Sequence, residues 1–94
     1  MENNIYLVLQ GVGLKKNEVQ ELVKANEGLE QADITVVVQN LNLLITYGYP
    51  EEDLADLIRV NPAFMLNSPA FLQQKLIAFG ENVEDILKTN PFEI

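Results

Sequence analysis

A seven-residue segment occurs three times in this 94-residue chain, and the repetition constrains the fold more than any other feature. Residues Glu21–Glu27 reappear in related form as Asp56–Pro62 and again as Asp85–Pro91. Each copy has an acid, two aliphatic residues, a base, one variable residue and an asparagine, and the last two copies add a proline. Repetition at this period is typical of stacked helical units that share one hydrophobic core.

The similarity extends upstream to a glycine in each copy. Gly13 and Gly48 precede their asparagines by the same number of residues, whereas Gly80 precedes its asparagine by three residues fewer. A loss of three residues is close to one helical turn, so the apolar face of the following helix keeps its direction. Each unit therefore predicts a helix, a turn with glycine, a second helix, and a stop at Asn or Asn-Pro.

The middle unit contains a β-branched run, Ile34–Val38, whose residue types favour a strand. The polar residues that follow indicate a helix instead, because steps of four, three and four place them on one helix side. These residues are Thr35, Gln39, Asn42 and Thr46. We therefore expect a helix of about four turns that begins near Asp33.

Other helix starts carry ordinary capping signals. Ser68-Pro69 reads as an N-cap followed by a first-turn proline, and Asn82 is expected to open a short last helix. Residues 63–66 are expected to form a tight turn packed on the core. The whole chain, residues 1–94, is thus predicted to be one all-α domain of about six helices. We expect three helix-turn-helix repeats, approximately 1–29, 30–66 and 67–94, stacked as a short α-solenoid or compact helical bundle.

Composition excludes several classes of protein. The chain has no cysteine and no histidine, so it lacks a thiolate nucleophile, the commonest metal ligand and a group that titrates near neutral pH. We therefore expect no enzyme, no metal and no cofactor. No apolar run is long enough to span a membrane, and the N-terminus lacks the basic start of a signal peptide, so we expect a cytoplasmic location.

The arrangement resembles the repeats of the mitochondrial transcription termination factor family. Residues Gly48–Leu66 are similar to one such motif, Leu72–Pro91 to the next, and the first unit is similar to a degenerate copy. The resemblance implies paired helices stacked into a solenoid, and nucleic-acid binding along a basic concave face. Two features depart from it: Glu27 stands where the repeat has proline, and the net charge is −8.

Three bases occupy the same position in successive units, and we call Lys24, Arg59 and Lys88 the base row. In a stacked array such a row would form a track for phosphates, as the family resemblance implies. The alternative, which we favour, is that each base pairs with the acid three residues earlier. These acids are Glu21, Asp56 and Asp85.

Apolar residues near both ends of the chain point to protein contacts. A short array has two open ends, and terminal repeats normally carry polar capping faces that this sequence lacks. A small core is expected to leave some bulky side chains exposed, and exposed apolar patches mark interaction sites. The predicted interface residues are Ile5, Tyr6, Phe64, Met65, Phe71, Phe92 and Ile94.

These observations favour a non-catalytic protein-interaction module, either a homodimer or a subunit of a larger assembly, with protein partners and no membrane. Nucleic-acid binding through the base row is the first alternative, and the acidic balance weighs against it because phosphates are recognised by bases. The second alternative is an acidic mimic of nucleic acid that acts on a protein partner.

Overall fold

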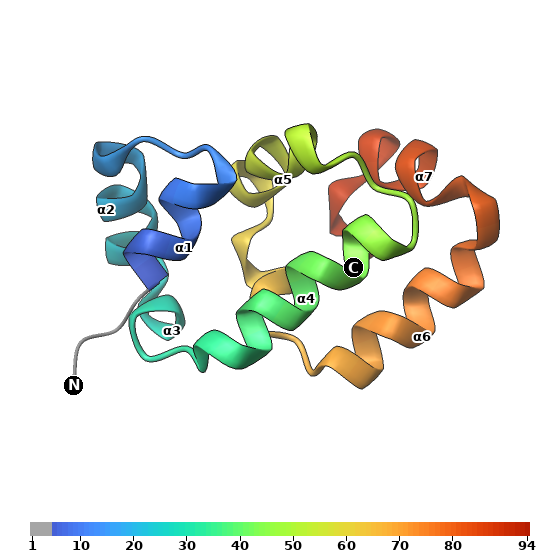
Figure 1. Ribbon diagram of the computed structural model, residues 1–94, viewed down its shortest axis with the longest axis horizontal. Coiled ribbons are helices and arrows are strands. Elements are labelled where there is room, and N and C mark those ends of the chain that lie inside the picture. Colours follow the sequence, from blue (N-terminus) through green and yellow to red (C-terminus); the bar gives the residue numbers. More distant parts are fainter. Residues whose placement is uncertain (1–4) are drawn as a thin grey trace.

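The computed structural model describes residues 5–94, which form an all-α protein (Figure 1). Six α-helices of seven residues or more account for most of this part of the chain, and a single-turn α-helix and short 3-10 turns connect them. The elements are α1 (Ile5–Val12), α2 (Lys16–Ala25), α3 (Glu27–Glu30), α4 (Ile34–Thr46), η1 (Glu51–Asp53), α5 (Leu54–Val60), η2 (Pro62–Leu66), α6 (Pro69–Phe79), η3 (Gly80–Asn82), α7 (Val83–Thr89) and η4 (Pro91–Glu93). The predicted all-α class and the compact helical bundle are confirmed.

The helices follow one another along the longest dimension of the molecule, 38 Å (Figure 1). α1 and α2 lie at the left end of the view, α4 and α5 in the middle, and α6 and α7 at the right end. We describe the three helix pairs as unit 1, unit 2 and unit 3, with the residue ranges expected from the repeat. Unit 1 contains α1 and α2, unit 2 contains α4 and α5, and unit 3 contains α6 and α7. The helix named first in each pair is the first helix of that unit, and the other is the second helix.

The capping residues place the helix starts. The side chain of Asp33 accepts a hydrogen bond from the Thr35 backbone N–H at 2.9 Å, which opens α4 where the sequence predicts. The Ser68 hydroxyl accepts one from the Phe71 backbone N–H at 3.2 Å, and Pro69 occupies the first turn of α6. The β-branched run is therefore helical, because burial along a helical stripe outweighs its strand propensity.

The repeated glycines form the turn inside each unit. Gly13, Gly48 and Gly80 all have positive φ, at 124°, 109° and 63°. A side chain at such a φ is strained, so glycine is the residue that lets the first helix stop and the second begin. The recurrence of this residue in all three units therefore has a backbone cause.

The second helix of unit 1 ends differently from the second helices of units 2 and 3. After Asn61 and Asn90 a proline begins a 3-10 turn, η2 or η4. Glu27 replaces this proline in unit 1, and the chain there forms the single α-helical turn α3. The departure from the repeat at Glu27 thus changes the type of turn.

One core runs through the three units. Equivalent leucines of the three first helices, Leu9, Leu44 and Leu76, are completely buried. Burial of a leucine contributes about 1.5–3 kcal/mol to stability, so this row stabilises the array substantially. The core is continuous from α1 to α7.

Asn40 is the exception in this core. It is fully buried at the position that Leu72 occupies in unit 3. Its side-chain amide donates hydrogen bonds to the carbonyls of Met65, at 3.0 Å, and Asn67, at 2.8 Å, with a longer one to Phe64. Asn40 therefore holds η2 and the start of the linker to unit 3 against α4.

Candidate interaction surfaces

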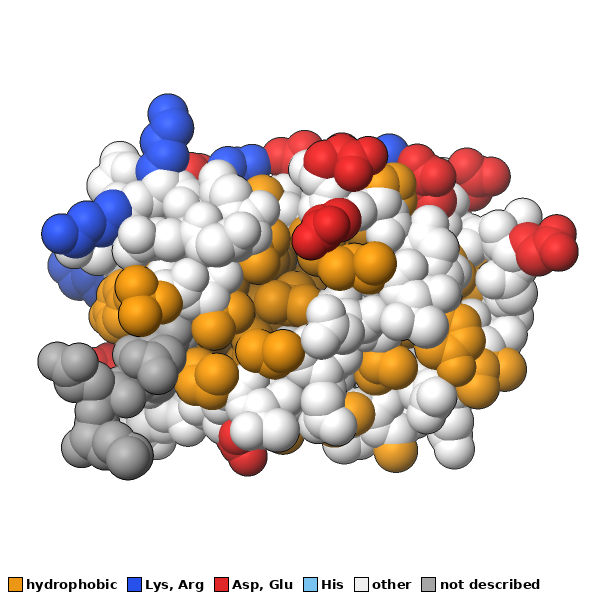
Figure 2. Space-filling view, viewed as in Figure 1, with side chains coloured by type: hydrophobic (Ala, Val, Ile, Leu, Met, Phe, Trp, Pro, Cys, Tyr) orange, Lys and Arg blue, Asp and Glu red, His pale blue; other side chains and the backbone are white. Residues whose placement is uncertain are grey.

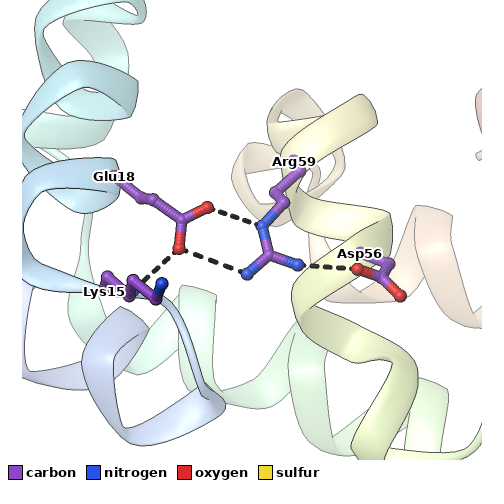
Figure 3. A network of polar contacts seen from close by, with 4 residues as sticks. All are labelled: Lys15, Glu18, Asp56 and Arg59. Atoms are coloured by element: carbon purple, nitrogen blue, oxygen red, sulfur yellow. Dashed lines mark hydrogen bonds and ion pairs between the residues drawn. The ribbon is translucent and has the colours of Figure 1, made fainter.

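Arg59, the middle member of the base row, bridges two units. Its guanidinium donates to both carboxylate oxygens of Glu18 in α2, at 2.7 and 3.2 Å (Figure 3). It also donates to Asp56 of its own helix at 2.6 Å, which is the contact predicted from the sequence. A guanidinium fits a carboxylate in this two-point fashion, so the pair fixes the orientation of α5 against α2.

Lys88 forms the corresponding bridge between units 2 and 3. Its ammonium group lies 2.7 Å from the Asp53 carboxylate, and Asp53 occupies in unit 2 the position of Glu18 in unit 1. It also pairs with Glu84 of its own helix at 2.8 Å, not with the predicted Asp85. The prediction for Lys88 is therefore wrong, because the ammonium group reaches the acid four residues earlier in α7 and not the acid three residues earlier.

Lys24, the first member of the base row, lies in unit 1. It is exposed and forms no ion pair with any residue in the described range 5–94, including the predicted partner Glu21. The base row thus consists of two bases that bridge units and one exposed base in unit 1.

The bridges change the ionisation of their members. The hydrogen bonds from Arg59 and from the Lys15 backbone lower the pKa of Glu18 from 4.5 to about 2. The carboxylates of Glu18 and Asp56 raise the pKa of Arg59, and those of Asp53 and Glu84 raise the pKa of Lys88. Arg59 and Lys88 are consequently held in their charged form by acids that compete with any phosphate.

The recurrent asparagines make three different contacts. Asn61 is buried and its amide donates to the Pro91 carbonyl of unit 3 at 2.9 Å. Asn26 donates within its own helix end, and the Asn90 side chain accepts from the Phe92 backbone N–H. Only Asn61 joins two units, so the row of amides serves helix ends and one junction.

Three of the predicted interface residues are buried. Ile5, Phe64 and Met65 belong to the core, with at most 1% of their surface exposed. The prediction that they contribute to an exposed patch is wrong, because η2 folds inward beneath α4 and carries Phe64 and Met65 with it.

The remaining four lie at or near the surface. Phe71 and Phe92 are exposed at 49% and 65%, whereas Tyr6 and Ile94 are half-buried against the core. The ammonium group of Lys75 lies 5.5 Å from the centre of the Phe71 ring, a cation–π contact that partly covers it. These residues are distributed over both ends of the molecule.

A larger apolar surface, not anticipated from the sequence, lies between the first helices of units 1 and 2. It is a groove of about 450 Å³, and Figure 2 shows apolar side chains along the middle of this face with acidic side chains above them. We call it the apolar groove, and it is lined by Val8, Gly11, Val12, Val38, Leu41, Asn42, Ile45, Glu51, Glu52 and Leu54. Val38 and Ile45 each expose more than a third of their surface.

Gly11 is the sequence signal that could have indicated the groove. It lies inside α1, where glycine costs about 0.5–1 kcal/mol relative to alanine. Its φ is not positive, and a Cβ added there would meet no atom within 4 Å, so neither the backbone nor packing requires glycine. A missing side chain on the wall of an open groove lets another backbone approach closely.

Within residues 5–94, no group of three or more Asp and Glu side chains could hold a metal ion. In the same range, none of the helices combines the length and apolar character that crossing a membrane requires.

Comparison of the chain with protein-family models, curated proteins and solved structures gave no match. The resemblance to the termination-factor repeats therefore stays a prediction.

Proposed function

We propose that this protein is a non-catalytic protein-interaction module whose binding surface is the apolar groove. The observation that supports the proposal most directly is the groove itself, an open apolar hollow between α1 and α4. Exposed apolar surface of this kind is characteristic of sites where another protein docks. The absence of histidine and cysteine from the sequence agrees with a role in binding.

The shape and charge of the groove favour an amphipathic helix as its occupant. Two helices form its walls, and apolar residues of α4 line it at helical spacing: Val38, Leu41 and Ile45. A helix lays its own apolar face into such a groove with anchors at the same spacing. Glu51 and Glu52 stand at one rim, exposed and without an ion pair to any residue from 5 to 94, so the partner helix carries lysine or arginine at that edge.

Fluorescence anisotropy of a labelled model peptide tests this proposal. The probe is an amphipathic 18-residue helix of leucine and lysine, and the matched control replaces every lysine by glutamate. We expect saturable binding of the lysine peptide only, and at least tenfold weaker binding to a Val38→Asp variant. Ile77→Asp, at an exposed aliphatic position on α6, is the control variant and leaves binding unchanged.

Equal binding of the two peptides, or equal binding to the wild type and the Val38→Asp variant, would contradict the proposal. Circular dichroism and thermal unfolding of both variants establish that each has the wild-type fold.

Nucleic-acid binding through the base row receives less support. A phosphate-binding role needs bases that are free to contact phosphates. Two members of the base row, Arg59 and Lys88, are each held by two carboxylates. Anisotropy with labelled duplex DNA at about 50 mM salt, where phosphate contacts are least screened, tests the first alternative directly.

A further inference from the structure

The second helices of successive units meet along two seams that are built from the same repeat positions. The seam between α2 and α5 has a hollow of about 250 Å³, and the seam between α5 and α7 has one of about 280 Å³, which we call the seam pocket. In the first seam Glu18 receives Arg59, as Figure 3 shows, and in the second Asp53 receives Lys88. The two hollows can therefore be compared position by position.

The two hollows differ in chemistry at one buried position. Leu14 lines the first hollow, and Tyr49 stands at the same repeat position in the seam pocket. Their backbone N–H groups donate to equivalent carbonyls, those of Leu9 and Leu44, and both side chains are 4% exposed. Acids and aliphatic residues recur in kind at the other shared positions, which are 18, 21, 22 and 25 in the first hollow and 53, 56, 57 and 60 in the second. Because leucine fills this position in the first seam, packing does not account for the Tyr49 hydroxyl.

The Tyr49 hydroxyl has no hydrogen-bond partner among residues 5–94. A polar group that is buried without a partner costs free energy, so its presence calls for a ligand or solvent at that point. Burial raises the pKa of this hydroxyl, and the charges that act on it belong to Lys88, Asp53, Asp56 and Glu84. The first three of these residues line the seam pocket, which places the hydroxyl at the pocket.

Two carboxylates of the seam pocket have an oxygen to spare. Asp53 uses Oδ2 to accept from Lys88, and Asp56 uses Oδ1 to accept from Arg59. The other oxygen of each carboxylate has no hydrogen bond to a residue of the described part of the chain. With Glu84 beside Lys88, three carboxylates meet two bases here, so the local charge is negative. A pocket of this charge favours a cation.

The rest of the lining is aliphatic and comes from Leu57, Val60, Leu87 and Pro91. Apolar walls pack against the carbon chain of a ligand, whereas a few polar groups fix its charged end. A primary ammonium group has three N–H donors. The Tyr49 hydroxyl and the spare oxygens of Asp53 and Asp56 supply the same number of acceptors.

We infer that the seam pocket binds a primary ammonium group at the end of a short aliphatic chain. The ammonium group donates to the Tyr49 hydroxyl and to the spare oxygens of Asp53 and Asp56, and the carbon chain lies along the aliphatic walls. A free alkylamine and a lysine side chain of another protein share this chemistry. The inference does not depend on the proposed function, because the seam pocket and the apolar groove share no residue.

NMR titration of the ¹⁵N-labelled protein with n-butylammonium chloride at roughly 20 mM salt, where ion pairs are little screened, tests the inference. We expect saturable shifts centred on the backbone amides of Tyr49, Asp53 and Lys88. A ligand this small is expected to bind with a Kd of about 1–10 mM. 1-Butanol has the same carbon chain without the charge, and it should bind at least fivefold more weakly.

Three variants assign the binding to the proposed groups. Tyr49→Phe removes only the hydroxyl and should weaken binding at least threefold, and Asp56→Asn, at an exposed position, should do the same. Tyr47→Phe is the matched control, because the Tyr47 hydroxyl accepts from Gln73 outside the seam pocket, and it should leave binding unchanged. The Tyr49 hydroxyl has no hydrogen bond to lose within residues 5–94, so Tyr49→Phe is expected to fold, and thermal unfolding verifies this.

The tripeptide acetyl-Ala-Lys-Ala-amide distinguishes the two sources of the ammonium group. Tighter binding of the peptide than of n-butylammonium supports the site as a receptor for protein lysine, and equal or weaker binding supports it as a site for a free amine. Absence of saturable shifts with both probes up to about 50 mM, or shifts centred outside the seam pocket, would overturn the inference. Equal affinity of the wild type and Tyr49→Phe for n-butylammonium, or equal binding of 1-butanol, would overturn it as well.

Discussion

The two sides of α4 differ sharply. Toward α6, a hollow of about 340 Å³ is lined largely by polar side chains such as Gln39 and Thr46. The amide of Gln73 donates to the Tyr47 hydroxyl at 3.0 Å and ties the end of α4 to α6. Toward α1 lies the apolar groove, which is lined mainly by aliphatic side chains. The polar hollow toward α6 can be solvated by water, whereas the apolar groove toward α1 is suited to binding a partner.

The same contrast applies to the two junctions of the array. Units 2 and 3 are joined by the Lys88 bridge, by Asn61, by the Asn40 contacts and by direct packing of α4 on α6. Units 1 and 2 are joined by the Arg59 bridge and by packing of α1 on α5, while the apolar groove lies between α1 and α4. We call the junction of units 1 and 2 the open junction. Substitutions at the junction of units 2 and 3 should therefore lower stability more than substitutions at the open junction.

The largest effect is expected for Asn40→Ala. The variant loses the amide that serves the carbonyls of Met65 and Asn67, and unpaired buried carbonyls are costly. We expect the free energy of unfolding to fall by about 2–4 kcal/mol. Urea denaturation measures it, and Asn42→Ala, an exposed position on the same helix, should change it by less than about 0.5 kcal/mol.

An equal effect of the two asparagine substitutions would mean that the Asn40 contacts do not hold η2. The midpoint of denaturation is the quantity to compare, provided that the slope of unfolding against urea stays constant.

Asn61→Ala comes next. It removes a buried amide that joins the end of unit 2 to the Pro91 carbonyl, and we expect a loss of about 1–2 kcal/mol. Asn90→Ala is the matched control at the same repeat position, where the side chain is exposed, and should cost about half as much or less. If Asn90→Ala lowers the free energy of unfolding as much as Asn61→Ala does, loss of helix-end capping would explain both results. The hydrogen bond between units 2 and 3 would then not be the cause.

Gly11→Ala separates stability from binding at the open junction. The helical position has room for a methyl group, so the variant should be more stable by about 0.5–1 kcal/mol. The same methyl group projects into the apolar groove and should weaken binding of the leucine–lysine peptide severalfold. Thermal unfolding and anisotropy on one sample measure both, and unchanged peptide binding would show that nothing approaches Gly11 closely.

The smallest effect is expected at the Arg59 bridge, because its members are exposed to water and salt. The folded-state pKa of Glu18, about 2, lies below the ordinary 4.5, so its contribution to stability is present above about pH 4.5 and is lost as the pH falls toward 2. Glu18→Gln removes this contribution. The difference in unfolding midpoint between wild type and variant should shrink from pH 6 to pH 2, and a constant difference would contradict the bridge.

The sequence was sufficient for much of the fold because the signals are local. A cap at Asp33, a proline after Ser68 and a positive-φ glycine in each unit act within a few residues, and each lies where predicted. The packing of residues 63–66 on the core was also predicted, and it is confirmed for Phe64 and Met65, so the separate prediction that these two side chains form an exposed interface fails. The long-range contacts of Asn40 with η2 could not be predicted from the repeat, because they join residues more than 20 positions apart.

The candidate surfaces were less predictable. The base row was visible in the sequence, but the partner of Arg59 in the preceding unit, Glu18, is set by the stacking of α5 on α2. The apolar groove depends on how far α1 stands from α4, which no spacing within one unit specifies. Gly11 was the only local sign, and its meaning requires knowing that open space surrounds it.

The constant position of the acid–base bridge has a consequence for chain length. The turn glycines of units 1 and 2 are 35 residues apart, and the base of each later unit matches the acid of the unit before it. A duplicated 35-residue segment inserted after unit 2 would present a copy of Arg59 to Asp53 and a copy of Asp53 to Lys88. The molecule is therefore a natural starting point for engineered rods of graded length, in which every added segment supplies the acid and the base that join it to its neighbours.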